Sequence, residues 1–244
     1  TYAFDSKYED GSSISYTGQT MRQLLINELK GHIGGLTDRI DSGWYPTEGE
    51  VADELLFFFE FDSETGGDYE FTSTPDNALQ TTFNDISTGK NLVGKIAGND
   101  DATDHKDWDD GDFVGWEGAS SPEDLVRQLI AEIDALAIAR ADGDDSLDNV
   151  FTTADGVDRQ QILQKFITGA ITFSQGADDY MDWDVDGKGL LADNTAAAGE
   201  GKAYSALEHA WDEGFGYFGA NRTYGLMTAA DIKAEGGQDA DGDG

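Results

Sequence analysis

The residues best suited to chemistry lie near the C-terminal end of the chain. They are one imidazole and three carboxylates in the segment 208–213: His209, Glu208, Asp212 and Glu213. In a helix, residues three and four apart are neighbours, so the His209 imidazole can lie beside the carboxylate of Asp212 or Glu213. Imidazole and carboxylate together suit iron or zinc. The spacing therefore predicts a transition-metal site on these four residues. The alternative is a structural histidine, held by a carboxylate inside a helical bundle.

A second group of acids has the spacing of a calcium-binding loop. Alternating aspartates around a tight turn ending in glycine, with a closing carboxylate at the twelfth position, are typical of such loops. The predicted calcium ligands are Asp182, Asp184, Asp186 and Asp193. Two features depart from the usual pattern: Asp193 is shorter than the usual glutamate, and Gly189 stands where an apolar residue is expected. The same alternation recurs in the tail 236–244, which we expect to be the start of a linker or of a calcium repeat.

The sequence offers few groups for nucleophilic catalysis. It has no cysteine, which excludes a disulfide framework and a thiolate metal site. It has three histidines and neither a G-x-S-x-G elbow nor an H-E-x-x-H zinc motif. A hydrolase that uses His209 as its base stays open as a third hypothesis, but we expect a protein that is not an enzyme.

The composition excludes several classes of partner. The chain of 244 residues has 50 Asp and Glu against 15 Lys and Arg, a formal charge of −35. Nucleic acid and anionic lipid both require a basic face, so neither is an expected partner. No apolar run is long enough to span a membrane. Self-repulsion of this size is relieved by salt or by bound cations, which suggests a halophilic or marine protein, or one that binds divalent metal. An ordinary protein with a solvated acidic face is the alternative.

The elements that must position these residues read as helices. Apolar residues recur at helical spacing, which predicts an all-α helical bundle with long acidic loops and a single domain over residues 1–235. Ser121-Pro122 gives the clearest start, and Gly34-Gly35 is expected to end the first helix, which Thr20 caps. The expected helices cover 20–33, 51–61, a pair broken at Gly89 within 78–96, 121–139, 157–173, 203–218 and 228–235.

Three ordered motifs resemble one family. The segment 208–219 (EHAWDEGFGYFG) is similar to the HxWDEAFGYFG signature of a domain-of-unknown-function family of bacterial lipoproteins, common in marine species. Residues 16–22 (YTGQTMR) resemble that family's SYSGQTAR stretch. Residues 153–158 (TADGVD), with the helix after them, resemble its TADGVDLxQLxxKGLMGA stretch.

The resemblance implies a location and a role. Family members are secreted, lipid-anchored helical proteins, and some are encoded near imelysin-like proteins, which are linked to iron uptake and carry an H-x-x-E helix motif. His209 and Asp212 match that motif, with Asp in place of Glu. We therefore expect an extracellular, cell-surface or periplasmic binding protein, in metal acquisition, whose partners are metal ions and an outer-membrane or surface protein. The second hypothesis is a calcium-stabilised structural or adhesive protein.

Overall fold

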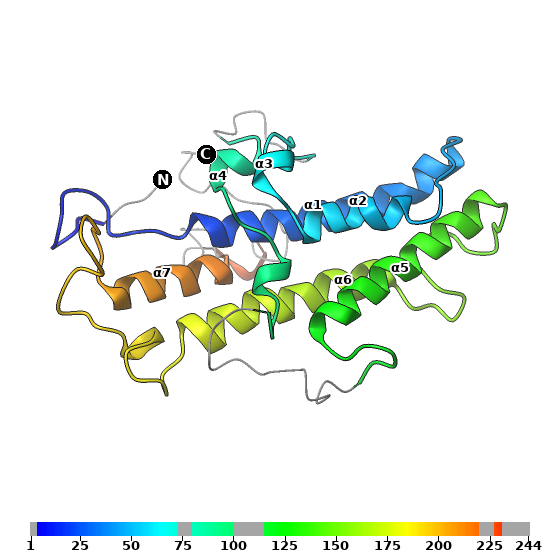
Figure 1. Ribbon diagram of the computed structural model, residues 1–244. Helices are drawn as coiled ribbons and strands as arrows, with labels where there is room; N and C mark the ends of the chain where they lie inside the picture. The colour runs from blue at the N-terminus through cyan, green and yellow to red at the C-terminus, as the bar shows by residue number, and fades with distance from the viewer. Residues whose placement is uncertain (1–3, 73–79, 100–114, 220–226, 231–244) are drawn as a thin grey trace.

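The chain folds around one long helix, α1 (Thr17–Asp41). The structure, a computed structural model, describes residues 4–72, 80–99, 115–219 and 227–230. Within these residues every regular element is a helix, apart from isolated β-bridges such as Asp5 with Ser12. The prediction of an all-α fold is confirmed. Figure 1 shows an elongated arrangement in which α1 runs along one side.

Helix α1 is longer at both ends than its pattern suggested. It begins at Thr17, so Thr20 does not cap it, and it continues through Gly34-Gly35 to Asp41. Each glycine costs about 1 kcal/mol relative to alanine in a helix interior. The extra turns bury Leu36 and Ile40, each worth about 1.5–3 kcal/mol, which offsets that cost. The chain turns instead at Gly43, whose φ is +104°.

Helices α2 (Glu50–Phe59) and α5 (Pro122–Ala141) pack on α1 and on each other. The start of α5 agrees with the sequence, since the Ser121 side chain accepts a hydrogen bond from the Asp124 N–H. The start of α2 is capped from outside its own segment. The buried Asp134 carboxylate of α5 accepts the N–H groups of Gly49, Val51 and Ala52 at 3.1–3.2 Å.

The other half of the bundle is built from α6 (Arg159–Ile167), η2 (Thr168–Tyr180) and α7 (Ala206–Phe218). The prediction of one helix over 157–173 is corrected: the helix extends to Tyr180, and from Thr168 onward it is a π-helix. The Met181 N–H donates to the Gly176 carbonyl at 3.0 Å, a spacing of five residues. Helix α7 packs on η2 and on α1, and Figure 1 shows α7 alongside α1.

Short helices complete the described residues: α3 (Ser63–Gly66), α4 (Phe83–Ile86), and the 3-10 turns η1 (Val93–Lys95) and η3 (Gly189–Leu191). The pair expected within 78–96 is therefore reduced to single turns. Phe83 and Ile96 are fully buried there and anchor these turns to the core. Most of the helix expected at 228–235, and the whole tail 236–244, lie outside the described residues. None of the described helices has the length and apolar character needed to cross a membrane.

Candidate functional site

Helix α7 carries the predicted metal ligands, and its first turn is tightly capped. Ser205 and Glu208 form a capping box: the Ser205 hydroxyl accepts the Glu208 N–H at 3.1 Å, and the Glu208 carboxylate accepts the Ser205 N–H at 2.8 Å. Glu208 thus starts the helix. At the other end, Gly219 adopts φ +69° and ends the helix.

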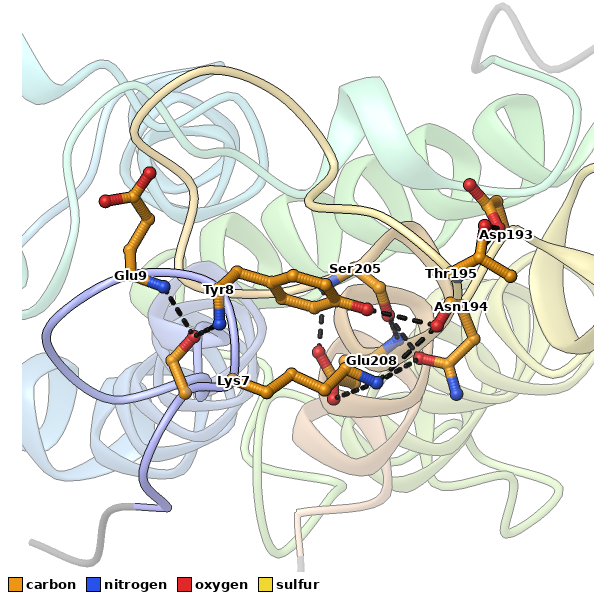
Figure 2. A network of polar contacts seen from close by, with 9 residues as sticks. Lys7, Tyr8, Glu9, Asp193, Asn194, Thr195, Ser205 and Glu208 are labelled. Carbon is orange, nitrogen blue, oxygen red and sulfur yellow. Dashed lines mark hydrogen bonds and ion pairs between the residues drawn. The ribbon is translucent and has the colours of Figure 1, made fainter.

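A polar network ties the N-terminal arm to the start of α7 (Figure 2). The Lys7 ammonium lies 3.6 Å from the Glu208 carboxylate and 3.3 Å from the Asn194 side-chain oxygen. The Tyr8 hydroxyl donates to the Asn194 carbonyl at 3.0 Å, and the Ser205 hydroxyl donates to the Asn194 side chain at 2.7 Å. The N-terminal arm is therefore folded back against α7 and the loop before it.

His209, Asp212 and Glu213 share one face of α7, as their spacing predicted, and this face turns inward. The Asp212 carboxylate accepts the Ser15 N–H at 3.0 Å, and the Glu213 carboxylate accepts the Gln19 amide at 2.8 Å. The His209 Nε2 lies 3.6 Å from the Glu213 carboxylate. The imidazole stacks on the Tyr204 ring at 4.4 Å, and its buried Nδ1 has no hydrogen-bond partner in the part of the chain that the structure describes.

Burial changes the acid–base behaviour of this face. It raises the pKa of the Asp212 carboxyl above its usual range, although the Ser15 N–H opposes this. Burial also raises the pKa of the Tyr180 phenol, with the Glu213 charge adding to the shift. It raises the pKa of Tyr217 to about 12. Both phenols are therefore neutral at physiological pH. The hydrolase hypothesis requires a hydroxyl that is hydrogen-bonded to a ring nitrogen of His209. In the described part of the chain neither ring nitrogen has such a bond.

The predicted calcium loop forms a tight turn at the end of η2. The buried Asp182 side chain accepts the Asp184 N–H at 3.1 Å, and its carbonyl accepts the Leu190 N–H at 2.7 Å. Gly189 stands where calcium loops usually have an apolar residue, and the structure shows why a glycine is needed there. Its φ is +50°, and a Cβ would lie 2.4 Å from the Asp182 carbonyl oxygen. Asp193 bonds the Thr195 N–H and hydroxyl at 2.8 and 2.6 Å.

The structure thus gives the predicted ligands separate partners. Asp184 and Asp186 are exposed, whereas Asp182 is buried. Among the described residues no group of three or more His, Asp or Glu side chains is placed to hold a metal ion. Both the transition-metal site and the calcium site remain predictions.

The opposite face of α7 is apolar and faces solvent. It carries the stripe Trp211, Gly214, Phe215 and Phe218, spaced i, i+3, i+4, i+7. The Trp211 side chain is 56% exposed and Phe218 is 69% exposed. On η2, Phe173 is 73% exposed. Together they border a hollow of about 620 Å³ between η2 and α7, which we call the aromatic groove.

Glycines explain why the groove exists. Gly176 of η2 and Gly214 of α7 line it, and a Cβ on Gly214 would lie 2.4 Å from the end of the Met181 side chain. On the other side of α7, a Cβ on Gly216 would lie 2.9 Å from the Cβ atoms of Gln19 and Tyr16. The glycines therefore let α7 approach both neighbours closely.

A smaller and more polar hollow of about 220 Å³ adjoins the groove, and we call it the polar hollow. The two share Thr172, Tyr217 and Phe218. The other side chains that line the polar hollow are Gln23, Ile26 and Asn27 of α1, with Gln164 and Thr168. The Tyr217 hydroxyl is held from behind by the buried Arg22 guanidinium at 3.1 Å. Among the described residues, no carboxylate, ammonium, guanidinium or imidazole lines either hollow.

Sequence reasoning missed Phe173, Trp211 and Phe218. The available signal was the i, i+3, i+4, i+7 stripe of α7, but such a stripe ordinarily marks the buried face of a helix. Here that face is the outer one.

Comparison with known proteins supports part of the resemblance. The model of a family described as Domain of unknown function (DUF4856) matches residues 132–231. This span contains the motifs at 153–158 and 208–219 together with both hollows' residues on α6, η2 and α7, whereas the motif at 16–22 lies outside it. Searches of the curated proteins and of the solved structures found no match.

Proposed function

We propose that this chain is a ligand-binding protein of the cell surface, the periplasm or the extracellular space, and that the aromatic groove is its binding site. The observation that carries the proposal is the orientation of α7. Its charged face, with Asp212 and Glu213, packs against α1 and the N-terminal arm. Its apolar face, with Trp211 and Phe218, is open to solvent.

This orientation works against stability unless something covers the outer face. Burying one large apolar side chain is worth about 1.5–3 kcal/mol. Three aromatic side chains, each more than half exposed, surround one hollow in a protein of charge −35. Apolar patches of this kind on an otherwise polar surface mark binding sites. The volume of about 620 Å³ lies within the range of small-molecule pockets.

Nile red, an uncharged dye that fluoresces in apolar surroundings, tests the proposal. We expect saturable binding of one dye molecule per protein, weakened about tenfold or more by Trp211→Ala, since an aromatic wall of the pocket is lost. The matched control is Trp183→Ala, because Trp183 is 74% exposed and lies outside the groove. Equal loss in both variants, or no saturable binding by the unmodified protein, would contradict the proposal.

Metal acquisition through His209 is a second candidate, supported by a different observation. The His209 Nδ1 is buried without a hydrogen-bond partner among the described residues, and the Nε2 is 3.6 Å from the Glu213 carboxylate, so imidazole and carboxylate lie side by side. These two residues would hold the ion, and Asp212 would have to release the Ser15 N–H to join them. Glu208 is engaged in the capping box and with Lys7, so its participation would require rearrangement of the first turn.

Calorimetric titration with Zn²⁺ or Fe²⁺ tests this candidate. Binding should disappear in His209→Ala and persist in His32→Ala, because the His32 imidazole is engaged with the Glu54 carboxylate at 2.7 Å. Unchanged metal binding by His209→Ala would exclude the site. Nile red binding should be the same in both histidine variants, which separates the two candidates.

A further inference from the structure

The two adjoining hollows together specify a class of ligand. The aromatic groove offers apolar walls, and the polar hollow beside it offers amide and hydroxyl groups. We propose that the site binds an uncharged amphiphile, with its apolar chain or ring in the aromatic groove and a hydroxyl or carbonyl head group in the polar hollow. This inference rests on the proposed function and adds the identity of the ligand class.

The head-group end has hydrogen-bonding capacity. Gln164, Thr168 and Thr172 form a chain along one wall: the Gln164 amide donates to the Thr168 hydroxyl at 3.2 Å, and the Thr172 hydroxyl donates to the Thr168 carbonyl at 2.5 Å. Asn27, on the opposite wall, is exposed, and its side chain makes no hydrogen bond within the described residues. An amide both donates and accepts, so Asn27 can pair with a hydroxyl or with a carbonyl.

Charge selects against ionic head groups. A carboxylate or sulfate would approach a protein of charge −35 and would find no ammonium or guanidinium among the described side chains that line either hollow. An ammonium would be drawn toward the protein but would find no carboxylate among the described side chains that line either hollow. Transferring an ion from water without a partner is costly, whereas a hydroxyl needs only the hydrogen bonds that are present.

The volumes of the two hollows, about 620 and 220 Å³, are those of a small-molecule site. Gln23 of α1 and Gln164 of α6 line the polar hollow. The Gln23 amide is committed there, donating to the Gly216 and Tyr217 carbonyls at 2.8 and 2.9 Å. That end of the site is therefore fixed by the packing of α7 on α1.

Displacement of Nile red by n-octanol, octanoate and octylammonium, which share one chain and differ in head-group charge, tests the inference. We expect n-octanol to displace the dye at about tenfold lower concentration than either ion, a difference of about 1.4 kcal/mol. In Asn27→Asp, which adds a carboxylate at the head-group end, octylammonium should gain affinity relative to n-octanol. Asn149→Asp, the same substitution outside both hollows, should leave the order unchanged.

The outcomes separate the two proposals. Saturable Nile red binding that octanoate or octylammonium displaces as well as n-octanol does, or that n-octanol fails to displace, would overturn the ligand class and leave the groove as a binding site. An order that Asn27→Asp and Asn149→Asp change alike would also overturn it, since the head group would then not lie in the polar hollow. Absence of saturable Nile red binding would overturn both proposals.

Discussion

Gly216→Ala is the most direct test of how α7 is held, because the change is one methyl group. In an open helix position, alanine in place of glycine stabilises by about 1 kcal/mol. At Gly216 the new Cβ would lie 2.9 Å from the Cβ atoms of Gln19 and Tyr16 and from the Tyr16 ring. Because Cβ atoms are fixed to the backbone, no side-chain rotation relieves the contact, and α1 and α7 must move apart.

Overpacking of this kind costs about 1–3 kcal/mol. Because three contacts lie below 3.0 Å, we expect the cost of Gly216→Ala to be at the upper end of this range. After the gain in helix propensity, the free energy of unfolding should fall by about 2 kcal/mol. For a chain of this size the melting temperature should fall by about 4–8 °C. The packing that holds the Gln19–Glu213 hydrogen bond would loosen as well, so Nile red affinity should also decrease.

Gly31→Ala is the matched control, measured by the same thermal and urea unfolding. Gly31 lies within α1, is exposed, and a Cβ there would meet nothing within 4 Å. Its melting temperature should rise by about 2–4 °C, since only the propensity gain remains. A Gly216→Ala variant as stable as Gly31→Ala would refute the close packing of α7 on α1 and the account of the groove that depends on it.

Four further measurements test other parts of the molecule. Asp134→Ala removes a carboxylate that caps α2 from α5, and should lower the free energy of unfolding in urea by about 1–3 kcal/mol, with α2 amides exchanging first; unchanged exchange in α2 would contradict this. The folded pKa of Asp212 is raised, so this carboxyl stabilises the folded state fully below about pH 3.9, and that stabilisation is lost as the pH rises. The stability of Asp212→Asn relative to the unmodified protein should therefore increase between about pH 4 and 7. A difference in unfolding free energy that does not change with pH would be inconsistent with the raised pKa. Raising NaCl from about 0.1 to 1 M shortens the Debye length from about 10 to 3 Å and should raise the melting temperature of this chain of charge −35. Calcium at about 100 times its Kd and constant ionic strength should add about 2.7 kcal/mol if the 182–193 loop binds it, and a melting curve indifferent to calcium would exclude that site.

Where several local signals agree, the sequence was a sufficient guide to the fold. Helix α5 starts as expected at Ser121-Pro122, followed by Glu123 and Asp124. Within one turn the serine caps the helix, the proline ring fixes the backbone angle φ, and the two acids lie at the positive end of the helix dipole. The predicted end of α1 was wrong because the burial that extends this helix depends on residues far away in the chain. Leu36 reaches the buried core shared with the other helices, and its burial outweighs the two glycines before it. The spacing of the apolar residues in η2 did not indicate that this helix is a π-helix.

The predicted ligands show a second limit. Alternating aspartates and a histidine beside carboxylates have the spacing of metal sites, but carboxylates also accept backbone N–H groups. Asp182 does so from Asp184, and Asp212 does so from Ser15, which is nearly two hundred residues away in the chain. A hydrogen bond to a partner that distant has no trace in local spacing. Residue types and spacing therefore drew attention to α7 as a candidate site without indicating which face of the helix is exposed.

The orientation of α7 connects these observations. Packing it the other way would bury Trp211 and Phe218, but Asp212 and Glu213 would then lose the Ser15 and Gln19 hydrogen bonds that satisfy them in partial burial. Close approach to α1 at Gly216 makes those bonds reachable, and Gly214 and Gly176 keep the outer side hollow. Different glycines thus serve the two faces: Gly216 lets the charged face approach α1, and Gly214 and Gly176 border the space on the other side, which aromatic side chains surround. A ligand that fills this space would complete the apolar burial that the helix alone leaves open.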